Sequence, residues 1–245
     1  EIESGLIVRV PGEQVILPQY YRDKVERHWD RLIKSGKTFF NGPIYTIIRE
    51  TSSETGIALE MAKTDYAHFL YTLHTPLRSK HDCRVIYTSS LVVTQDGKYV
   101  IGIMGRDTFA PGKLQLIGGG LDESDIHNEL ADLDHSVKKE LKEELGIDAD
   151  DRTTVKDIRQ KHLKAGGAHG FMSVIYKVSL ILTSSQVLER FERHCASMRS
   201  EGQEPEIKTL VFVNTTIKAV RMFTARNKHE KDENLIPVMM ADASV

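Results

Sequence analysis

The spacing of apolar residues predicts that helices and strands alternate along the chain. Apolar side chains recur at helical spacing from Tyr20 to Lys34 and again around Tyr66 to His74. Between these helices, short apolar runs predict strands at Ile44–Ile48 and Ile57–Ala62. Pro76 to Asp82 is polar and basic, so we expect it to join an N-terminal part to the main part of the chain.

From Val85 onward the pattern changes to strands joined by tight turns, of which Gln95-Asp96-Gly97-Lys98 is a strong hairpin signal. One helix is expected to end at about Leu145, and two more are expected at Gln186–Met198 and Thr216–Ala225. The tail after Asn227 is expected to fray. The expected strands are Val85–Val93, Tyr99–Met104, Leu114–Ile117, Val155–Ile158, Phe171–Ile181 and Lys208–Val213.

Strands and helices in this order predict the α/β class, with a mixed sheet flanked by helices. We expect two parts, a small N-terminal α+β region at residues 1–80 and a main domain at residues 81–245. A chain of 245 residues is long enough to bury the core of such an arrangement.

The charge balance limits the choice of partners. With 33 basic and 35 acidic residues the net charge is −2, which gives no bulk attraction to nucleic acid or to an anionic membrane. An anionic substrate would therefore be met locally, by a metal or a few basic side chains. Cys83 and Cys195 lack metal-ligand spacing and are expected to be free thiols, and we expect a cytoplasmic protein without a membrane span or leader.

Three carboxylates share one face of the helix that ends at Leu145. Glu140, Glu143 and Glu144 have the i, i+3, i+4 spacing that places side chains within one turn. Like charges so close repel each other, and Mg²⁺ would neutralise them because it prefers carboxylate oxygens. The alternative is an ordinary solvated face, on which Lys138, Lys139 and Lys142 offset the charge.

The context of this helix resembles the Nudix box, whose pattern is G-x5-E-x7-R-E-U-x-E-E-x-G-U, with U a bulky aliphatic residue. A strand leads into Gly118-Gly119-Gly120, an acidic stretch follows, and Gly146-Ile147 ends the glutamate helix. The second half of the pattern is met by Glu140, Leu141, Glu143, Glu144, Gly146 and Ile147. The resemblance implies a Nudix-type α/β/α sandwich for the main domain.

The box departs from the pattern in two places. Lys139 stands where the family has arginine, which keeps the charge but loses the planar bidentate fork. The family's arginine lies fourteen positions after its glycine, whereas Lys139 follows Gly120 by nineteen (139 − 120), so about five residues are inserted. Strict counting puts the internal glutamate at Ala131, so either Glu123 or Glu129 replaces it or no residue does.

The resemblance implies a Mg²⁺-dependent enzyme, with Mn²⁺ as a substitute, that hydrolyses the pyrophosphate bond of a nucleoside diphosphate linked to another group. By resemblance, Glu140, Glu143 and Glu144 bind the metal, and the latter two also serve catalysis. The backbone at Gly119 and Gly120 could approach metal or phosphate closely because no side chain intervenes. A simple tight turn is the alternative for these glycines.

The sequence identifies the general base and the substrate-binding residues less directly than the metal ligands. Glu204 and Glu206 precede a late strand, and Glu206 is our candidate general base. His169, in a glycine-rich loop, and Arg106, after the second hairpin strand, are candidates for substrate binding. Each of these has the alternative of being an ordinary surface side chain.

The first third of the chain resembles, loosely, the leading region of Nudix proteins that hydrolyse UDP-sugars, which favours a nucleotide sugar as substrate. The matching residues are Trp29, Phe40-Asn41-Gly42-Pro43-Ile44-Tyr45, Thr64-Asp65-Tyr66 and Phe69-Leu70-Tyr71-Thr72. Their alternative role is that of core aromatics.

Three other readings stay open. The first is a non-catalytic Nudix-fold module that binds a nucleotide or regulates a partner, which the altered box motivates. The second is an isomerase of the isopentenyl-diphosphate kind, which is disfavoured because neither cysteine lies beside the box. The third is an acidic structural helix in an unrelated α/β domain. A homodimer is compatible with any of these.

Overall fold

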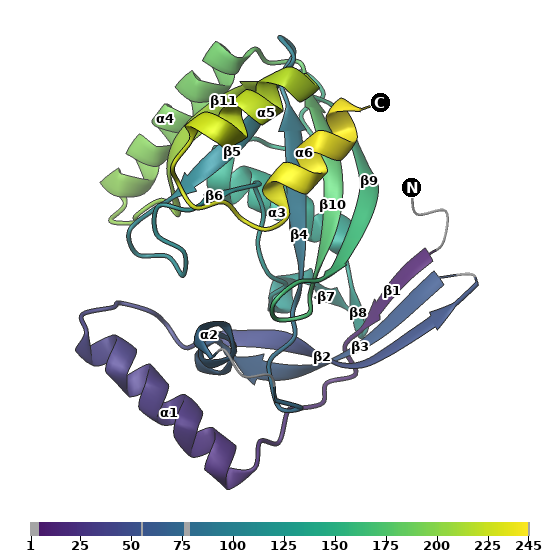
Figure 1. Cartoon of the computed structure of the whole chain (residues 1–245), viewed down its shortest axis with the longest axis vertical. Helices are drawn as coiled ribbons and strands as arrows, with labels where there is room; N and C mark the ends of the chain where they lie inside the picture. Colours follow the sequence, from purple (N-terminus) through teal and green to yellow (C-terminus); the bar gives the residue numbers. More distant parts are fainter. Residues whose placement is uncertain (1–4, 55, 76–78, 245) are drawn as a thin grey trace. The chain divides into compact units, whose positions relative to one another are not determined.

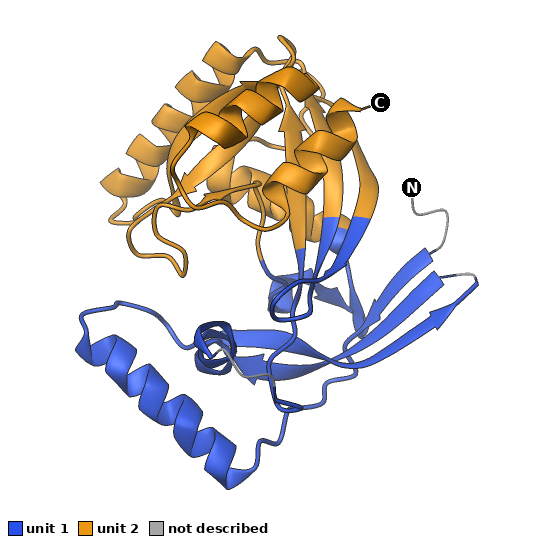
Figure 2. Cartoon of the chain, viewed as in Figure 1, with its two compact units in different colours: residues 1–87, 120–133, 163–174 blue, residues 88–119, 134–162, 175–245 orange. Residues whose placement is uncertain are grey.

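The structure is a computed structural model that describes residues 5–54, 56–75 and 79–244 (Figure 1). The chain divides into two compact units that alternate along the sequence (Figure 2). Unit 1 comprises Glu1–Tyr87, Gly120–Leu133 and Leu163–Val174, and unit 2 comprises Thr88–Gly119, Asp134–His162 and Ile175–Val245. Each unit is described by itself.

Unit 1 contains a five-stranded sheet in the order β2-β3-β1-β8-β7 and two helices. Strand β1 is parallel to β3, whereas the β2–β3, β1–β8 and β7–β8 pairs are antiparallel. The strands are β1 (Gly5–Arg9), β2 (Pro43–Ser53), β3 (Gly56–Asp65), β7 (Ile126–His127) and β8 (Leu130–Ala131). The helices are α1 (Gln19–Lys34), which buries Tyr21 and Val25 against Ala67, and α2 (Tyr66–His74), and both were expected. Of the expected connection at Pro76–Asp82, residues 76–78 lie outside the described residues.

The residues inserted between Gly120 and Lys139 form a small hairpin rather than an open loop. After a short 3-10 helix at Glu123–Asp125, β7 and β8 are joined by a turn in which Asn128 and Glu129 have φ of 51° and 61°. Positive φ at both central residues is the geometry of a two-residue hairpin turn. Leu130 of β8 pairs with Arg9 of β1, and the Val10 N–H donates to the Glu129 carbonyl at 2.8 Å. The insertion is therefore part of the unit 1 sheet.

Unit 2 is built on a sheet in the order β11-β5-β4-β10-β9, with the short β6 paired to β5. Its strands are β4 (Ile86–Val93), β5 (Lys98–Met104), β6 (Leu114–Gln115), β9 (Val155–Gly166), β10 (Phe171–Leu180) and β11 (Ile207–Asn214). One end of β4, β9 and β10, at residues 86–87, 163–166 and 171–174, belongs to unit 1. Its helices are α3 (Leu133–Leu145), α4 (Ser184–Ser200), α5 (Ile217–Arg226) and α6 (Leu235–Ala243). Strand β6 is shorter than expected and β9 is longer.

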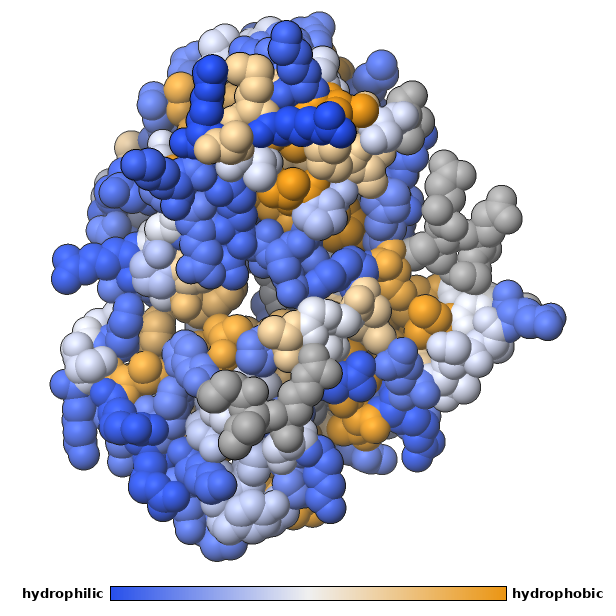
Figure 3. Space-filling view, in the orientation of Figure 1, coloured by the Kyte–Doolittle hydropathy of each residue, from blue (hydrophilic) through white to orange (hydrophobic). Residues whose placement is uncertain are grey.

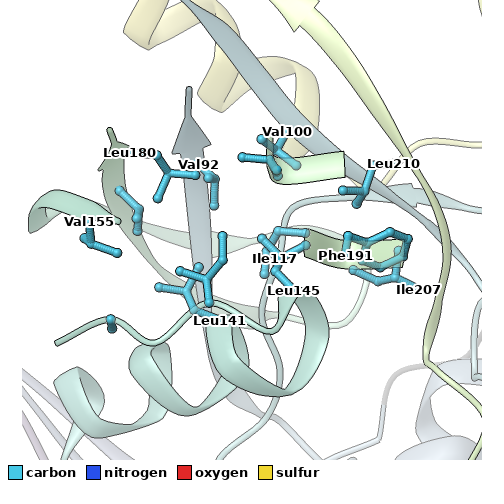
Figure 4. Close-up of a cluster of buried hydrophobic side chains, with 14 of the residues drawn as sticks. Val92, Val100, Ile117, Leu141, Leu145, Val155, Leu180, Phe191, Ile207 and Leu210 are labelled. Carbon is cyan, nitrogen blue, oxygen red and sulfur yellow. The ribbon is translucent and has the colours of Figure 1, made fainter. Parts of the chain in front are cut away.

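Neighbouring residues of the central strands face opposite sides of this sheet, and each side carries its own apolar cluster. Val92 and Val100 belong to the cluster that contains Leu141 and Leu145 of α3 and Phe191 of α4 (Figure 4). Leu91 and Tyr99 belong to the other cluster, together with buried residues of α5 and α6: Val220, Leu235, Val238 and Met239. Two helices therefore lie on each face, and the expected α/β class with a mixed sheet is confirmed.

The tail after Asn227 does not fray as expected. Helix α6 buries Leu235 and Met239 completely, and the Tyr99 hydroxyl donates to the Asp242 carboxylate at 2.9 Å. Lys177 donates to the same carboxylate at 2.6 Å. The expectation was wrong because apolar burial and these polar contacts hold a segment that is too short to be a stable helix alone.

The surface is mixed in character. The space-filling view shows polar side chains interspersed with scattered apolar ones (Figure 3), which is ordinary for a folded protein. Within the described part of the chain, no helix is both long enough and apolar enough to cross a membrane.

Candidate active site

The glutamate helix α3 is held to the unit 2 sheet by its apolar side. Leu141 and Leu145 are fully buried, as is Ile147 just beyond the helix end. Gly146 ends the helix with φ of 67°, a left-handed conformation that glycine adopts without strain. The anchored apolar side fixes the rotation of the helix and hence the direction of Glu140 and Glu144.

Glu144 is the most unusual of these carboxylates, because only 7% of the residue is exposed. Its Oε2 accepts a hydrogen bond from the Gly118 N–H at 2.7 Å, whereas its Oε1 is buried with no hydrogen-bond partner. Burial raises the pKa of Glu144 well above the usual range, and the charge of Glu140 raises it further, followed by those of Glu206 and Glu143. A buried carboxylate with an unsatisfied oxygen is costly unless a cation or a proton meets it.

The three glycines before the helix have different surroundings. Gly118 has φ of 147°, and a Cβ there would lie 2.8 Å from the Ser89 Cα and closer still to the Thr88 carbonyl oxygen. A Cβ on Gly119 would lie 2.5 Å from Oε1 of Glu140. A Cβ on Gly120 would meet nothing within 4 Å. Gly118 and Gly119 are thus packed against neighbouring groups, and Gly120 is not.

Glu206 lies within electrostatic range of Glu143 and Glu144, although it is distant from them in the sequence. It directly precedes β11, and its carbonyl accepts a hydrogen bond from the Gly105 N–H at 2.6 Å, at the end of β5. The residue keeps exposed surface, yet packing around the side chain raises the pKa of Glu206, and the charge of Glu143 adds to this. Glu204 is exposed and lies 3.9 Å from the Arg199 side chain instead.

Unit 2 therefore brings Glu140, Glu143, Glu144 and Glu206 within electrostatic range of one another. Arg106 follows Gly105 and is exposed, with its backbone next to the segment that carries Glu206. As they stand, no three or more His, Cys, Asp or Glu side chains of the described residues are grouped closely enough to hold one metal ion. The arrangement is a cluster of like charges, which a bound cation would stabilise.

Other candidates belong to unit 1. His169 stacks on Phe171, with ring centroids 5.2 Å apart, in the turn between β9 and β10. Glu123 pairs with Lys63 of β3, and Glu129 occupies the β7–β8 turn. The structure thus gives both glutamates local roles within the unit 1 sheet.

The N-terminal residues that suggested a nucleotide sugar also have local roles. The Asn41 side chain accepts a hydrogen bond from the Ala67 N–H at 2.7 Å, and the Asp65 carboxylate accepts from the His68 N–H at 2.9 Å. Both stabilise the first turn of α2. Trp29 packs beside the Tyr21–Val25–Ala67 cluster and also lines an open cleft of unit 1.

One residue of the site was missed from the sequence. The ring nitrogen Nε2 of His194 lies 2.7 Å from the carbonyl oxygen of Glu143. His194 belongs to α4 and is separated from Glu143 by 51 residues. No local pattern signals this contact, because it depends on how α4 packs across the end of α3.

No family model and no curated protein matches the sequence. Solved structures match in fold, among them a Deinococcus radiodurans protein with 12% identity and a TM-score of 0.46, over 82% of this chain and 99% of that one. A Nudix hydrolase from Nitrosomonas europaea has 13% identity and a TM-score of 0.38, over 66% of this chain and 88% of that one. A bifunctional NMN adenylyltransferase/ADP ribose pyrophosphatase from Francisella tularensis has 10% identity and a TM-score of 0.41, over 70% of this chain and 43% of that one. At these identities and TM-scores the likeness says nothing of the activity of this chain.

Proposed function

We propose that the protein is a Nudix-type pyrophosphohydrolase that uses Mg²⁺ or Mn²⁺ at the end of α3. The observation that carries the proposal is the buried Glu144 carboxylate, whose Oε1 has no hydrogen-bond partner in a cluster of like charges. A purely structural helix would gain nothing from burying such a group. A hard divalent cation is the ligand that carboxylate oxygens in this arrangement suit best.

Glu140, Glu143 and Glu144 would hold the metal, and its chemistry would be to neutralise phosphate charge and lower the pKa of a bound water. The Gly118 N–H orients Glu144 through its Oε2, and the absence of a side chain at Gly119 leaves Glu140 its position. Glu206 is the residue that we assign as proton acceptor for the attacking water, since it directly precedes β11 and lies within electrostatic range of these carboxylates.

For the substrate, we propose a nucleoside diphosphate joined to another group, with a nucleotide sugar such as a UDP-sugar as the first choice. The support is the N-terminal sequence resemblance. Arg106, exposed beside the Glu206 segment, is the basic side chain that we assign to a substrate phosphate. Gly120 and His169 stay candidates for substrate binding.

A non-catalytic, nucleotide-binding module is the second candidate. The substitution of Lys139 for arginine and the hairpin in place of the usual box loop favour it. Turnover separates the two functions, because a binding module would retain ligand affinity without releasing product.

The test is hydrolysis of nucleotide sugars, dinucleotides and ADP-ribose in the presence of Mg²⁺. We expect turnover of at least one compound, a loss of about 100-fold or more in Glu144→Gln and Glu206→Gln, and near-normal rates in the matched control Glu204→Gln. Glu204 is two residues from Glu206 and exposed, so its variant controls for charge in the same loop. Absence of turnover across the panel, with nucleotide binding retained, would establish the binding module instead.

A further inference from the structure

The last turn of α3 carries Glu143 and Glu144, so its stability bears directly on the proposed metal site. Carbonyl groups in the last turn of a helix lack the amide partner that the next turn would supply. Here the Gly146 N–H donates to the Lys142 carbonyl at 3.0 Å and the Ile147 N–H donates to the Leu141 carbonyl at 3.1 Å. The Glu143 carbonyl receives a side chain instead, the His194 imidazole at 2.7 Å.

We infer that His194 is a positioning residue for the metal site, which holds the last turn of α3 through the Glu143 carbonyl. A carbonyl can only accept, so Nε2 of His194 carries the proton in this contact, in the neutral as well as in the charged ring. The inference rests on the proposed function, since it concerns the affinity of that site for its metal.

The contact is built into the packing of two helices. Phe191 and Cys195 on either side of His194 are 3% exposed and lie in the same apolar cluster as Leu141 and Leu145. Helix α4 is thus anchored beside α3, and the imidazole is carried by a rigid element rather than by a loop. Such anchoring limits the freedom of the ring and strengthens its hold on the carbonyl.

Gly146 completes the arrangement. A Cβ on Gly146 would lie 2.8 Å from both Cβ and Cγ of His194. The backbone at the end of α3 therefore packs directly against the His194 side chain. The glycine serves two needs at once, a positive φ and the space that His194 occupies. The end of the glutamate helix and His194 therefore fit each other specifically.

Loss of this contact should loosen Glu143 and weaken metal binding. Partners that touch a metal ligand directly contribute about 10-fold to 100-fold in affinity. His194 acts one step further away, through the backbone, so we expect roughly threefold to tenfold weaker binding when its donor is removed.

The test uses Mn²⁺ titrations of the full-length chain, with free Mn²⁺ measured by electron paramagnetic resonance. His194→Asn, whose shorter amide does not reach the carbonyl, should bind Mn²⁺ threefold to tenfold more weakly, by the argument above. His194→Gln, whose amide nitrogen takes the place of Nε2, should bind like the wild type. Arg193→Gln is the matched control, because Arg193 is the exposed neighbour on the same helix. Hydrogen exchange at residues 143–147 should rise in His194→Asn alone.

The outcomes separate the inference from the proposed function. Wild-type affinity in a folded His194→Asn variant would overturn the inference and leave the metal site standing. Equal weakening in His194→Gln and His194→Asn would also overturn it, because the role would then be one of packing. If Glu144→Gln binds Mn²⁺ as the wild type does, the proposed metal site is wrong, and the inference falls with it. If His194→Asn does not fold, weaker Mn²⁺ binding or faster exchange at residues 143–147 in His194→Gln would overturn the inference, and wild-type values would support it.

Discussion

Alanine substitutions at three consecutive glycines test the structure of the site, because each glycine has different surroundings. Gly118→Ala places a methyl group against the backbone of Thr88 and Ser89 at φ of 147°. A strained backbone conformation costs about 1 to 3 kcal/mol, and an overlap in a packed region costs about 1 to 3 kcal/mol. The free energy of unfolding should therefore fall by roughly 2 to 6 kcal/mol, a large part of the stability of a typical domain.

Gly119→Ala should behave differently, because the atoms nearest to the new methyl group are those of the Glu140 carboxylate. A flexible side-chain end can move aside, so stability should change by less than about 1 kcal/mol. The displaced carboxylate would no longer serve the metal, and Mn²⁺ affinity should fall by about tenfold or more. Gly120→Ala is the control, since nothing lies within 4 Å of the new group. Its stability should stay within about 1 kcal/mol of the wild type.

Urea denaturation measures the three free energies, and Mn²⁺ titration measures the affinities. Gly118→Ala with the stability of Gly120→Ala would refute the packing of Gly118 against the Thr88 backbone. Unchanged Mn²⁺ affinity in Gly119→Ala would refute the assignment of Glu140 to the metal.

The remaining predictions concern the core and the titrating groups. Leu145→Ala removes a fully buried side chain and should destabilise the protein by about 2 to 5 kcal/mol in urea denaturation; a loss below about 1 kcal/mol would contradict the packing of α3. Burial raises the pKa of the Cys83 thiol to about 12, so iodoacetamide at pH 8 should modify it only after unfolding, and rapid labelling of the native protein would disprove its burial. Hydrogen bonds from Thr153 and Thr154 lower the pKa of Asp151 to about 2 from its usual 3.8. A carboxyl group whose pKa is lower in the folded state than in the unfolded state stabilises the fold at pH values above its unfolded-state pKa. The contribution of Asp151 is therefore complete above about pH 4 and is lost as the pH falls through 2. Asp151→Asn should reduce the acid sensitivity of unfolding in that interval, and identical pH profiles would count against these hydrogen bonds.

Local sequence signals predicted most of the fold where local interactions determine it. The helix expected around Tyr66–His74 has these bounds, because its apolar spacing and the Asp65 cap both lie within the segment. Strand β1 was missed because Gly5–Arg9 is short and is held by parallel pairing with β3. Helix α6 was missed because Leu235–Ala243 is apolar almost throughout and contains Pro237, so it lacks the periodic pattern of an amphipathic helix.

The site was predictable only in the part that a single helix carries. Their spacing predicted that Glu140, Glu143 and Glu144 lie on one helix, which is α3. No local signal predicted the inserted hairpin, since its strands have two residues each and depend on pairing with Arg9. Glu206 was a candidate by position, and it joins the cluster through the pairing of β11 with β5. The His194 contact depends on helix packing across 51 residues, which no periodicity encodes.

Thermal unfolding of the wild type and Glu144→Gln, with and without Mn²⁺, tests the central claim most directly. Glutamine removes a buried charge with an unsatisfied oxygen while keeping an acceptor for the Gly118 N–H, so the metal-free variant should match or exceed the wild-type Tm. Mn²⁺ should raise the Tm of the wild type and not that of the variant, because a ligand stabilises only the state that binds it. A lower Tm for the metal-free variant, together with an equal rise on adding Mn²⁺, would identify Glu144 as a structural group and contradict the account.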